Sequence, residues 1–520
     1  MTTEGSETVG FIDVGTNSIH LLVARFFDGS VGTPVFQDKE TVRLGQSLYS
    51  TGSIDPGIIS KSALVVSRFA RISREMGADR VVAYATCAAR EASNSRELMS
   101  ALSGAADVQV IPGTEEARLT ALGVFGTSGP SERTVLIDIG GGSTEVVVAE
   151  GGANLFIDSL AMGAVRYAYG LGVDNTLAVS DRDYSEMRRN VDVSSYRASS
   201  AVRSLGFTRA VGSSGTLIAL AEMCAAIRPD GDPSYMTRSE LSALMRDVRS
   251  RDLRGRHSVP GLGRGRADII VAGGAIAEEL MTLFGIERME ISTRGLKQGM
   301  QADHLLSRGY TMFETRDASV RALACRCHYD RKHAEAVRVN GLRIFDMTRG
   351  LGLHGMSDGM RSLLASACTL HDIGEFVNYT NHHVMSQMII ESSDMVGFTC
   401  TELHHMGLMV RLHHKRFPGP EDLLFSDIPR PVVDDIRRCA LFLRMADVLD
   451  RHRTSTVTDL TMAVSDGTLV LGVVSSEDPS MEIWRLGRLR GDFRKLFGLE
   501  LQPEPVPASG DDGVARCQPI

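Results

Sequence analysis

Two stretches of the chain share an order of apolar and polar positions that is typical of a β-hairpin. Residues 11–24 read FIDVGTNSIHLLVA, and residues 135–148 read VLIDIGGGSTEVVV. Each runs from an apolar segment through Asp and Gly to small polar residues, and then into a second apolar segment. Because β-branched residues favour strands and glycine favours tight turns, we predict a hairpin at each place. Asp13 and Asp138 are 138 − 13 = 125 residues apart, which indicates one structural unit used twice.

Strand-like and helix-like segments alternate over the first 300 or so residues. Residues 80–90 predict a strand and then a loop, and residues 108–124 predict a strand, a Pro-Gly break and a helix. Residues 207–227 predict a strand, a Gly-Ser turn and a helix. Residues 267–286 repeat that plan, with Gly273-Gly274 between strand and helix. This alternation predicts an α/β fold.

Beyond residue 305 the pattern changes to apolar residues at spacings of three and four, which predicts helices over 334–348, 361–377 and 431–451. Residues 459–474 then predict a hairpin and residues 482–501 a helix. The Pro- and Gly-rich segment 503–520 predicts disorder. We therefore expect α/β subdomains at 1–125 and 126–304, a helical domain at 305–455, a small α+β domain at 456–505 and a disordered tail at 506–520.

Composition narrows the class of protein. The 520 residues include 56 basic and 64 acidic side chains, a formal charge of −8, and no basic block of the kind that binds nucleic acid. No apolar run approaches the ~20 residues of a membrane span, and the N-terminus lacks the pattern of a secretory signal. The eight cysteines are scattered, which predicts neither a disulfide framework nor a zinc ribbon; Cys325, Cys327 and His328 are a weak metal candidate. We expect a cytoplasmic protein without a membrane or nucleic-acid partner.

The glycines of the two hairpins predict phosphate binding. A Walker A loop needs a lysine after the glycines and a Rossmann fingerprint needs a helix, and neither follows here. A tight turn that presents successive backbone N–H groups can hold a phosphate. A carboxylate beside that phosphate requires a bridging cation, and Mg²⁺ prefers such oxygen ligands. Gly212–Gly215 and Gly273-Gly274, each before an apolar helix, are two further candidate anion sites, although plain tight turns would explain any one cluster.

The order of these motifs resembles the exopolyphosphatase / guanosine pentaphosphate phosphohydrolase family of the actin/hexokinase/Hsp70 superfamily. The resemblance rests on residues 12–24, 85–92, 111–124, 137–145, 212–223, 266–274 and 292–299, and covers about residues 9–300. It implies an α/β fold with two actin-like (ribonuclease H-like) subdomains. The longer members imply an all-α HD-like domain and a small C-terminal α+β piece after them, and typically form homodimers.

The resemblance also implies roles for single residues. Glu116 matches the catalytic base that orients or deprotonates water, although the residues alone favour the simpler interpretation that it stabilises a helix start. Asp13 and Asp138 match the positions tied to Mg²⁺. The predicted phosphate contacts are Asn17, Ser18, Arg90, Gly140, Gly141, Gly142, Ser143 and Gly215. Lys297 and Gln298 depart from the family, which more often has Arg and Glu there, so they are not counted as site residues.

Ten of the fourteen histidines lie between His328 and His414. The order of His333, His371, Asp372 and Asp447 resembles that of HD-domain phosphohydrolases, in which four such side chains bind a divalent metal. We therefore expect a possible second metal site, against the simpler interpretation that these residues cap and pair within a helical domain. His382, His383, His413 and His414 fit metal ligands, phosphate contacts or a surface patch equally well.

These observations predict a Mg²⁺-dependent hydrolase that releases orthophosphate from the ends of inorganic polyphosphate. The alternative is conversion of guanosine pentaphosphate (pppGpp) to ppGpp, which needs the same atoms. A sugar or acetate kinase of the same superfamily is a rival interpretation, as is a non-catalytic polyphosphate-binding scaffold. A pure binder would have no need of Glu116, which argues against the scaffold.

Overall fold

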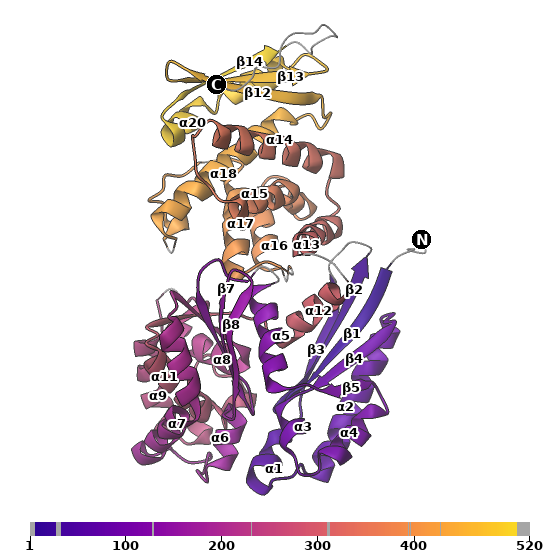
Figure 1. The fold of residues 1–520 in the computed structure, drawn as a ribbon, viewed down its shortest axis with the longest axis vertical. Helices are drawn as coiled ribbons and strands as arrows, with labels where there is room; N and C mark the ends of the chain where they lie inside the picture. Colours follow the sequence, from indigo (N-terminus) through magenta and orange to yellow (C-terminus); the bar gives the residue numbers. More distant parts are fainter. Residues whose placement is uncertain are drawn as a thin grey trace. The chain divides into compact units, whose positions relative to one another are not determined.

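The computed structural model of the chain forms two compact units (Figure 1). Unit 1 comprises residues 1–319 with 396–399, and unit 2 comprises residues 320–395 with 400–520. The structure describes residues 6–27, 33–126, 129–229, 231–308, 312–393, 395, 397–415, 417–426 and 428–506.

The first sheet of unit 1 has the strand order β3-β2-β1-β4-β5. Its strands are β1 (Ser6–Val14), β2 (Ser18–Phe27), β3 (Thr33–Thr41), β4 (Arg80–Ala85) and β5 (Asp107–Val110). β1–β2 and β2–β3 are antiparallel, whereas β4 and β5 join in parallel. The first predicted hairpin is β1–β2, with Asp13 paired to His20 and the Gly15 N–H donating to the Ser18 carbonyl over 3.1 Å.

The second sheet repeats this plan, with the order β10-β11-β9-β6-β7-β8. Its strands are β6 (Thr134–Ile139), β7 (Thr144–Glu150), β8 (Ala153–Leu160), β9 (Arg209–Ser213), β10 (Tyr235–Thr237) and β11 (Arg288–Ile291). β6–β7 and β7–β8 are antiparallel, and β9 and β11 continue in parallel, as β4 and β5 do in the first sheet. Asp138 pairs with Glu145, and the Gly140 N–H donates to Ser143 over 3.0 Å. The predicted duplication is confirmed, and it includes the hydrogen bond that closes each hairpin turn.

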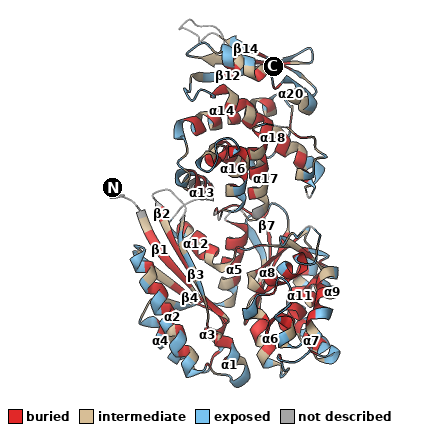
Figure 2. Ribbon diagram, turned by 180° about the vertical axis from the view of Figure 1, so that it is seen from behind, coloured by how far each residue is buried: buried red, intermediate tan, exposed pale blue. Residues whose placement is uncertain are grey.

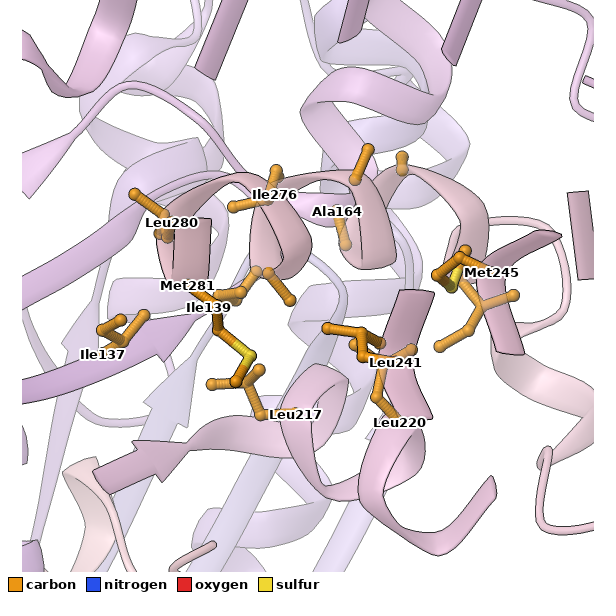
Figure 3. Packing of buried hydrophobic residues seen from close by; sticks show 14 of the residues in the cluster. Ile137, Ile139, Ala164, Leu217, Leu220, Leu241, Met245, Ile276, Leu280 and Met281 are labelled. Carbon is orange, nitrogen blue, oxygen red and sulfur yellow. The ribbon is translucent and has the colours of Figure 1, made fainter. Parts of the chain in front are cut away.

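Helices cover the sheets, and the outer faces of these helices are exposed to solvent (Figure 2). They are α1 (Leu44–Thr51), α2 (Pro56–Glu75), α3 (Cys87–Glu91), α4 (Ser95–Ser103), α5 (Gly113–Phe125), α6 (Ala164–Gly170), α7 (Asp181–Leu205), α8 (Ser214–Ala225), α9 (Arg238–Arg249), α10 (Leu253–Arg256), α11 (Ile270–Phe284) and α12 (Leu296–Ser307). In the larger core, Ile137 and Ile139 of β6 belong to one buried cluster with Leu217 of α8 and Met281 of α11 (Figure 3). This packing fixes where β6 ends and α8 begins.

Two local predictions for unit 1 are wrong. Residues 87–91 form α3 instead of a loop. Gly273 and Gly274 lie within α11, and the element directly before that helix is a 3-10 helix at Arg264–Arg266 and not a strand. A Cβ at Gly273 would collide with Thr216 of α8, and one at Gly274 with Met245 of α9. These two glycines therefore permit close helix packing and do not form a turn before a helix.

Helix α5 lies between the two sheets. Leu119 packs with Phe11 and Met300 beside the first sheet, while Ala121 packs with Leu136 beside the second. α12 runs along α5 and contacts β1, so the chain returns to the first sheet within the range predicted for the second subdomain. A Cβ at Gly123 would collide with the Gly295 carbonyl, and one at Gly299 with the Leu119 carbonyl. The two helices are thus in backbone contact.

Unit 2 is helical, with a small three-stranded sheet. Helix α13 (Met312–Arg326) leads into it, and α14 (Arg331–Gly350), α15 (Asp358–Leu370), α16 (His382–Glu391), α17 (Cys400–Leu412) and α18 (Arg430–Leu449) follow. Its C-terminal part contains β12 (Val457–Ser465), β13 (Thr468–Ser475), α19 (Ser480–Gly487), α20 (Arg490–Phe497) and β14 (Glu500–Val506). No helix among the described residues combines the length and apolar character that a membrane crossing requires.

The C-terminal prediction needs correction in two respects. The single helix predicted over 482–501 is two helices and the start of a strand. Residues 503–506, predicted to be disordered, belong to β14, which pairs in parallel with β13. β14 is an edge strand. Pro503 and Pro505 fit there because the outward N–H groups that they lack have no strand partner. Residues 507–520 lie outside the described residues.

The contact between α5 and α12 generates the first prediction. Gly299→Ala or Gly123→Ala forces the two helices apart, and we expect each to lower the free energy of unfolding of unit 1 by about 1–3 kcal/mol or more. The control is Gly104→Ala, at an exposed site where an added Cβ meets nothing within 4 Å, with an expected effect within about 0.5 kcal/mol. Thermal and denaturant unfolding measure this. Unchanged unfolding of both α5–α12 variants would contradict the close packing.

Candidate functional site

The two hairpin turns meet at a cavity of about 480 Å³ in unit 1. Its walls come from residues 15–18 and 139–143 of the turns, residues 213–216 at the start of α8, and residues 293–298 before and within α12. The predicted residues that line it are Asp13, Asn17, Ser18, Glu116, Asp138, Gly140, Gly141, Gly142, Ser143 and Gly215. Of the site residues predicted for unit 1, Arg90 alone is not in this lining. The repeated motif thus brings its polar residues to one place.

The turn glycines are required by contacts within the protein. A Cβ at Gly141 would meet Thr16 at 3.2 Å, and one at Gly142 would collide with the Tyr49 hydroxyl. A Cβ at Gly215 would collide with the Arg266 guanidinium. Within the described part of the chain, the N–H groups of Gly141 and Gly142 donate to no backbone carbonyl. The second turn therefore packs against the first while its amides remain available to an anion.

Four carboxylates lie near one another here: Asp13, Glu116 and Asp138 line the cavity, and the buried Glu145 lies opposite Asp138 in the hairpin. Burial first, and then the charges of Glu116 and Asp138, raise the pKa of Asp13 to about 7 against the opposing effect of Lys297. Burial also raises the pKa of Asp138 to about 6. The pKa of Glu145 is raised well above its usual value, by burial and then by Glu116 and Asp138. Such a set of oxygen donors is repulsive by itself and fits a hard divalent cation such as Mg²⁺.

Glu116 stands in the first turn of α5 and is held by Arg90. The Arg90 Nη1 donates to Glu116 Oε2 over 2.9 Å and to the Ile111 carbonyl over 2.8 Å. Burial raises the pKa of Glu116, while the Arg90 charge and hydrogen bond oppose that shift. Arg90 therefore orients the carboxylate and favours its ionised form. Its predicted contact with phosphate stays a prediction.

Positive charge gathers on the other walls of the cavity. Lys39, Arg266 and Lys297 all line it. After burial, the charges of these three residues lower the pKa of His20, to about 3, so His20 is neutral. Lys297 and Gln298, which the sequence analysis excluded, both line the cavity. Clustered cations beside clustered carboxylates suit a polyanion bound together with a metal ion.

Glu145 is the carboxylate that sequence reasoning missed. It is 2% exposed, accepts a hydrogen bond from the Ser159 hydroxyl over 2.8 Å, and lies opposite Asp138 in the hairpin. Its counterpart 125 residues earlier is His20, which lies opposite Asp13. Extending the repeat by two residues past Ser18 and Ser143 would have found both.

In unit 2 the predicted quartet comes together. His333 Nε2 lies 3.2 Å from His371 Nε2, 3.6 Å from Asp447 Oδ1 and 3.7 Å from Asp372 Oδ2. His382 and His413 extend the cluster, each facing Asp372. His382 also forms a group with His383 and His414 that could hold a metal ion. Cys325, Cys327 and His328 belong to no such group among the described residues.

Two family models match the chain. The model of the Ppx/GppA phosphatase family matches residues 22–308, and that of Ppx/GppA phosphatase, domain III, matches residues 315–476. The first match alone covers more than half of the sequence.

Curated relatives match nearly the whole length. The guanosine-5'-triphosphate,3'-diphosphate pyrophosphatase of Photobacterium profundum is 27% identical over 467 residues, 88% of this chain and 90% of the relative. The protein of the same name from Aeromonas hydrophila is 28% identical over 473 residues, 89% of this chain and 92% of the relative. A solved structure of an exopolyphosphatase from Cytophaga hutchinsonii is 24% identical, has a TM-score of 0.52 and covers 59% of this chain and 99% of its own, which supports the fold.

The carboxylate cluster predicts a stability that depends on pH and on cation. The folded pKa values of Asp13 and Asp138, about 7 and about 6, exceed the usual 3.8. Folded protein therefore keeps protons that the unfolded chain releases, and this stabilisation is complete below about pH 4 and lost as the pH rises to about 7. We expect Mg²⁺ to raise the melting temperature more at about pH 8 than at about pH 5, because bound cation competes with those protons.

The control for this prediction is the double variant Asp13→Asn, Asp138→Asn, which should lose most of the Mg²⁺ effect. A Mg²⁺-induced shift of equal size at both pH values, or one retained in the double variant, would contradict the assignment.

Proposed function

The chain belongs to the Ppx/GppA phosphatase family and is a hydrolase of phosphoanhydride bonds, and we propose that its substrate is guanosine pentaphosphate. The reaction is hydrolysis of the terminal anhydride of the 5′-triphosphate, which yields orthophosphate and guanosine 5′-diphosphate 3′-diphosphate. The observation that carries this proposal is the likeness along 88–89% of the chain to proteins named for that nucleotide. It spans unit 2 as well as the cavity-bearing unit.

The cavity supports hydrolysis as the chemistry. Glu116 is the one carboxylate of the group that is fixed by an arginine, and it accepts a proton from water at its position in the cavity wall. Backbone amides of the turns at 15–18 and 140–143 hold the oxygens of the terminal phosphate. Lys39, Arg266 and Lys297 bind the following phosphates. Charge neutralisation and an oriented water are what phosphoanhydride cleavage chiefly requires.

Asp13 and Asp138 are the residues that would hold Mg²⁺, as the sequence analysis expected. When bound, this ion supplies charge neutralisation for the phosphate oxygens beside the two carboxylates. Glu116 is held through Oε2 by Arg90, which leaves its other oxygen to accept the proton of the water.

Inorganic polyphosphate is the second candidate substrate, and it was the leading expectation from sequence. The cations of the cavity favour it, because Lys39, Arg266 and Lys297 recognise phosphate chains without reference to a base. The full-length relatives favour the nucleotide.

The test is release of orthophosphate from guanosine pentaphosphate and from long polyphosphate, assayed in parallel with Mg²⁺. We expect a higher kcat/KM for the nucleotide, and a loss of about 10²- to 10⁴-fold in Glu116→Gln. The matched control is Glu115→Gln. Glu115 stands on the same helical turn, pairs with Arg118 and is absent from the cavity lining, so activity should be retained.

Preference for polyphosphate, abolished in Glu116→Gln, would keep the site and replace the substrate. Full activity of Glu116→Gln would overturn the site itself.

Removal of Arg90 gives a separate prediction. Without the guanidinium the pKa of Glu116 rises, since burial is no longer opposed. The base must be ionised, so we expect the acidic limb of the kcat/KM profile of Arg90→Gln to move to higher pH. Arg96→Gln, at an exposed position of α4, is the control. A loss of equal size at every pH would indicate instead that Arg90 binds phosphate, as the sequence analysis predicted.

A further inference from the structure

The histidine cluster of unit 2 contains two groups of side chains that could hold a metal ion, and Asp372 lies beside both. One set is His333, His371 and Asp447, and the other is Asp372, His382 and His413; within each, the ligand atoms lie within 4.8 Å of one another. Asp372 Oδ2 faces the first set, at 3.5 Å from His371 Nε2 and 3.7 Å from His333 Nε2. Asp372 Oδ1 faces the second, at 3.5 Å from His382 Nε2 and 3.7 Å from His413 Nε2. The two oxygens of one carboxylate therefore point at different histidine pairs.

The tautomers of the histidines leave lone pairs facing each other. Nδ1 of His371 is 2.8 Å from the Cys368 carbonyl, and Nδ1 of His382 is 2.9 Å from the Tyr379 carbonyl. A carbonyl only accepts, so each Nδ1 carries the proton and each Nε2 of the neutral ring is bare. Nδ1 of His413 similarly faces the Val410 carbonyl.

Nδ1 of His333 faces a carboxylate oxygen of Asp450 at 2.8 Å, so it too is the donor. Nε2 of His333 and His371 then approach to 3.2 Å, and Nε2 of His382 and His413 to 3.3 Å. Two bare nitrogens at such distances repel, and the pair is satisfied only if one ring takes up a second proton or a metal ion lies between them. Each pair thus calls for its own positive charge.

Unpartnered oxygens complete the argument. Asp447 Oδ1 and Asp372 Oδ1 are buried and have no hydrogen-bond partner among the described residues, and Asp447 is 5% exposed. Arg451 binds Asp447 Oδ2 and Arg453 binds Asp372 Oδ2, so these cations hold the carboxylates by the other oxygen. A buried carboxylate oxygen without a partner is unfavourable, and a metal ion removes that penalty.

We propose that unit 2 binds two divalent transition-metal ions side by side, bridged by Asp372. The first ion takes His333, His371, Asp447 and Asp372, and the second takes Asp372, His382 and His413. Ligands of one ion at about 2.1 Å, with angles near those of a tetrahedron or octahedron, lie roughly 3.0–3.4 Å apart, slightly less than most separations seen here. Four imidazoles select borderline ions such as Zn²⁺ or Fe²⁺ over Mg²⁺.

The second ion has three protein ligands, which leaves coordination positions open to water or an anion. An open coordination position is typical of catalytic metal sites. The site is also chemically distinct from the carboxylate site of unit 1. This inference extends the quartet expected from sequence and does not depend on the proposed substrate.

The experiment counts Zn²⁺ bound to the full-length chain in excess Mg²⁺, by equilibrium dialysis and elemental analysis. The protein carries Asp13→Asn and Asp138→Asn, so that the unit 1 site does not contribute. We expect two ions per chain. His413→Ala should keep only the first and His371→Ala only the second, whereas Asp372→Ala should weaken both by about tenfold or more.

Two matched histidine variants control this pattern. His404→Ala removes an exposed histidine paired with Glu391 and should keep both ions. His383→Ala should also keep both, because His383 belongs to the alternative group with His382 and His414. Circular dichroism and melting of each variant verify folding.

Fewer than two ions in the parent protein would overturn the proposal. Loss of one ion in His383→Ala would overturn the assignment of the second site. If Asp372→Ala weakens the binding of only one ion or of neither, the proposal that Asp372 bridges the two ions is overturned.

Discussion

Repulsion among closely spaced carboxylates is the interaction on which the chemistry of unit 1 depends. Asp13, Glu116, Asp138 and Glu145 lie where two copies of one sheet motif meet. Burial raises the pKa of each, and neighbouring carboxylates raise those of Asp13, Glu116 and Glu145 further. The nearby cations oppose this only in part: Arg90 is engaged with Glu116, and Lys297 acts on Asp13. Such a cluster gains stability by binding what neutralises it. This arrangement supports the proposal that a metal ion and a phosphate chain bind here together.

Sequence predicts the parts of this fold that are locally encoded. The two Asp-Gly hairpins follow from β-branched runs and glycine, and the structure repeats them in sheets of matching order. Gly273 and Gly274 were misread because their reason lies in Thr216 and Met245, on other helices. Residues 503–506 form a strand only because β13 offers an edge. Both errors concern partners distant in the chain, which local composition does not encode.

The site shows the same division. Sequence placed ten of the lining residues, because the repeated motif and the family resemblance both point to them. It did not foresee Glu145, or that Arg90 binds Glu116 directly. In unit 2 it assembled His333, His371, Asp372 and Asp447 but left His382 and His413 open. The relation of His382 and His413 to the quartet is visible only in the structure, where the two oxygens of Asp372 face different histidine pairs. The two centres also differ in donor type, since oxygen surrounds one and imidazole the other, so that each would draw a different ion from the same solution.

The backbone contact of α5 with α12 makes this helix pair the connection between the two sheets of unit 1. α5 packs on both sheets. After β11 of the second sheet, the chain returns to the first sheet through α12. Any rotation of one sheet against the other would therefore turn about α5, where displacements are smallest. The turns at 15–18 and 140–143 belong to different sheets and would separate. Glu116 stands on α5 itself and would keep its hydrogen bond with Arg90. Under the proposed function, such an opening would separate the turns that contact phosphate and leave Glu116 beside Arg90.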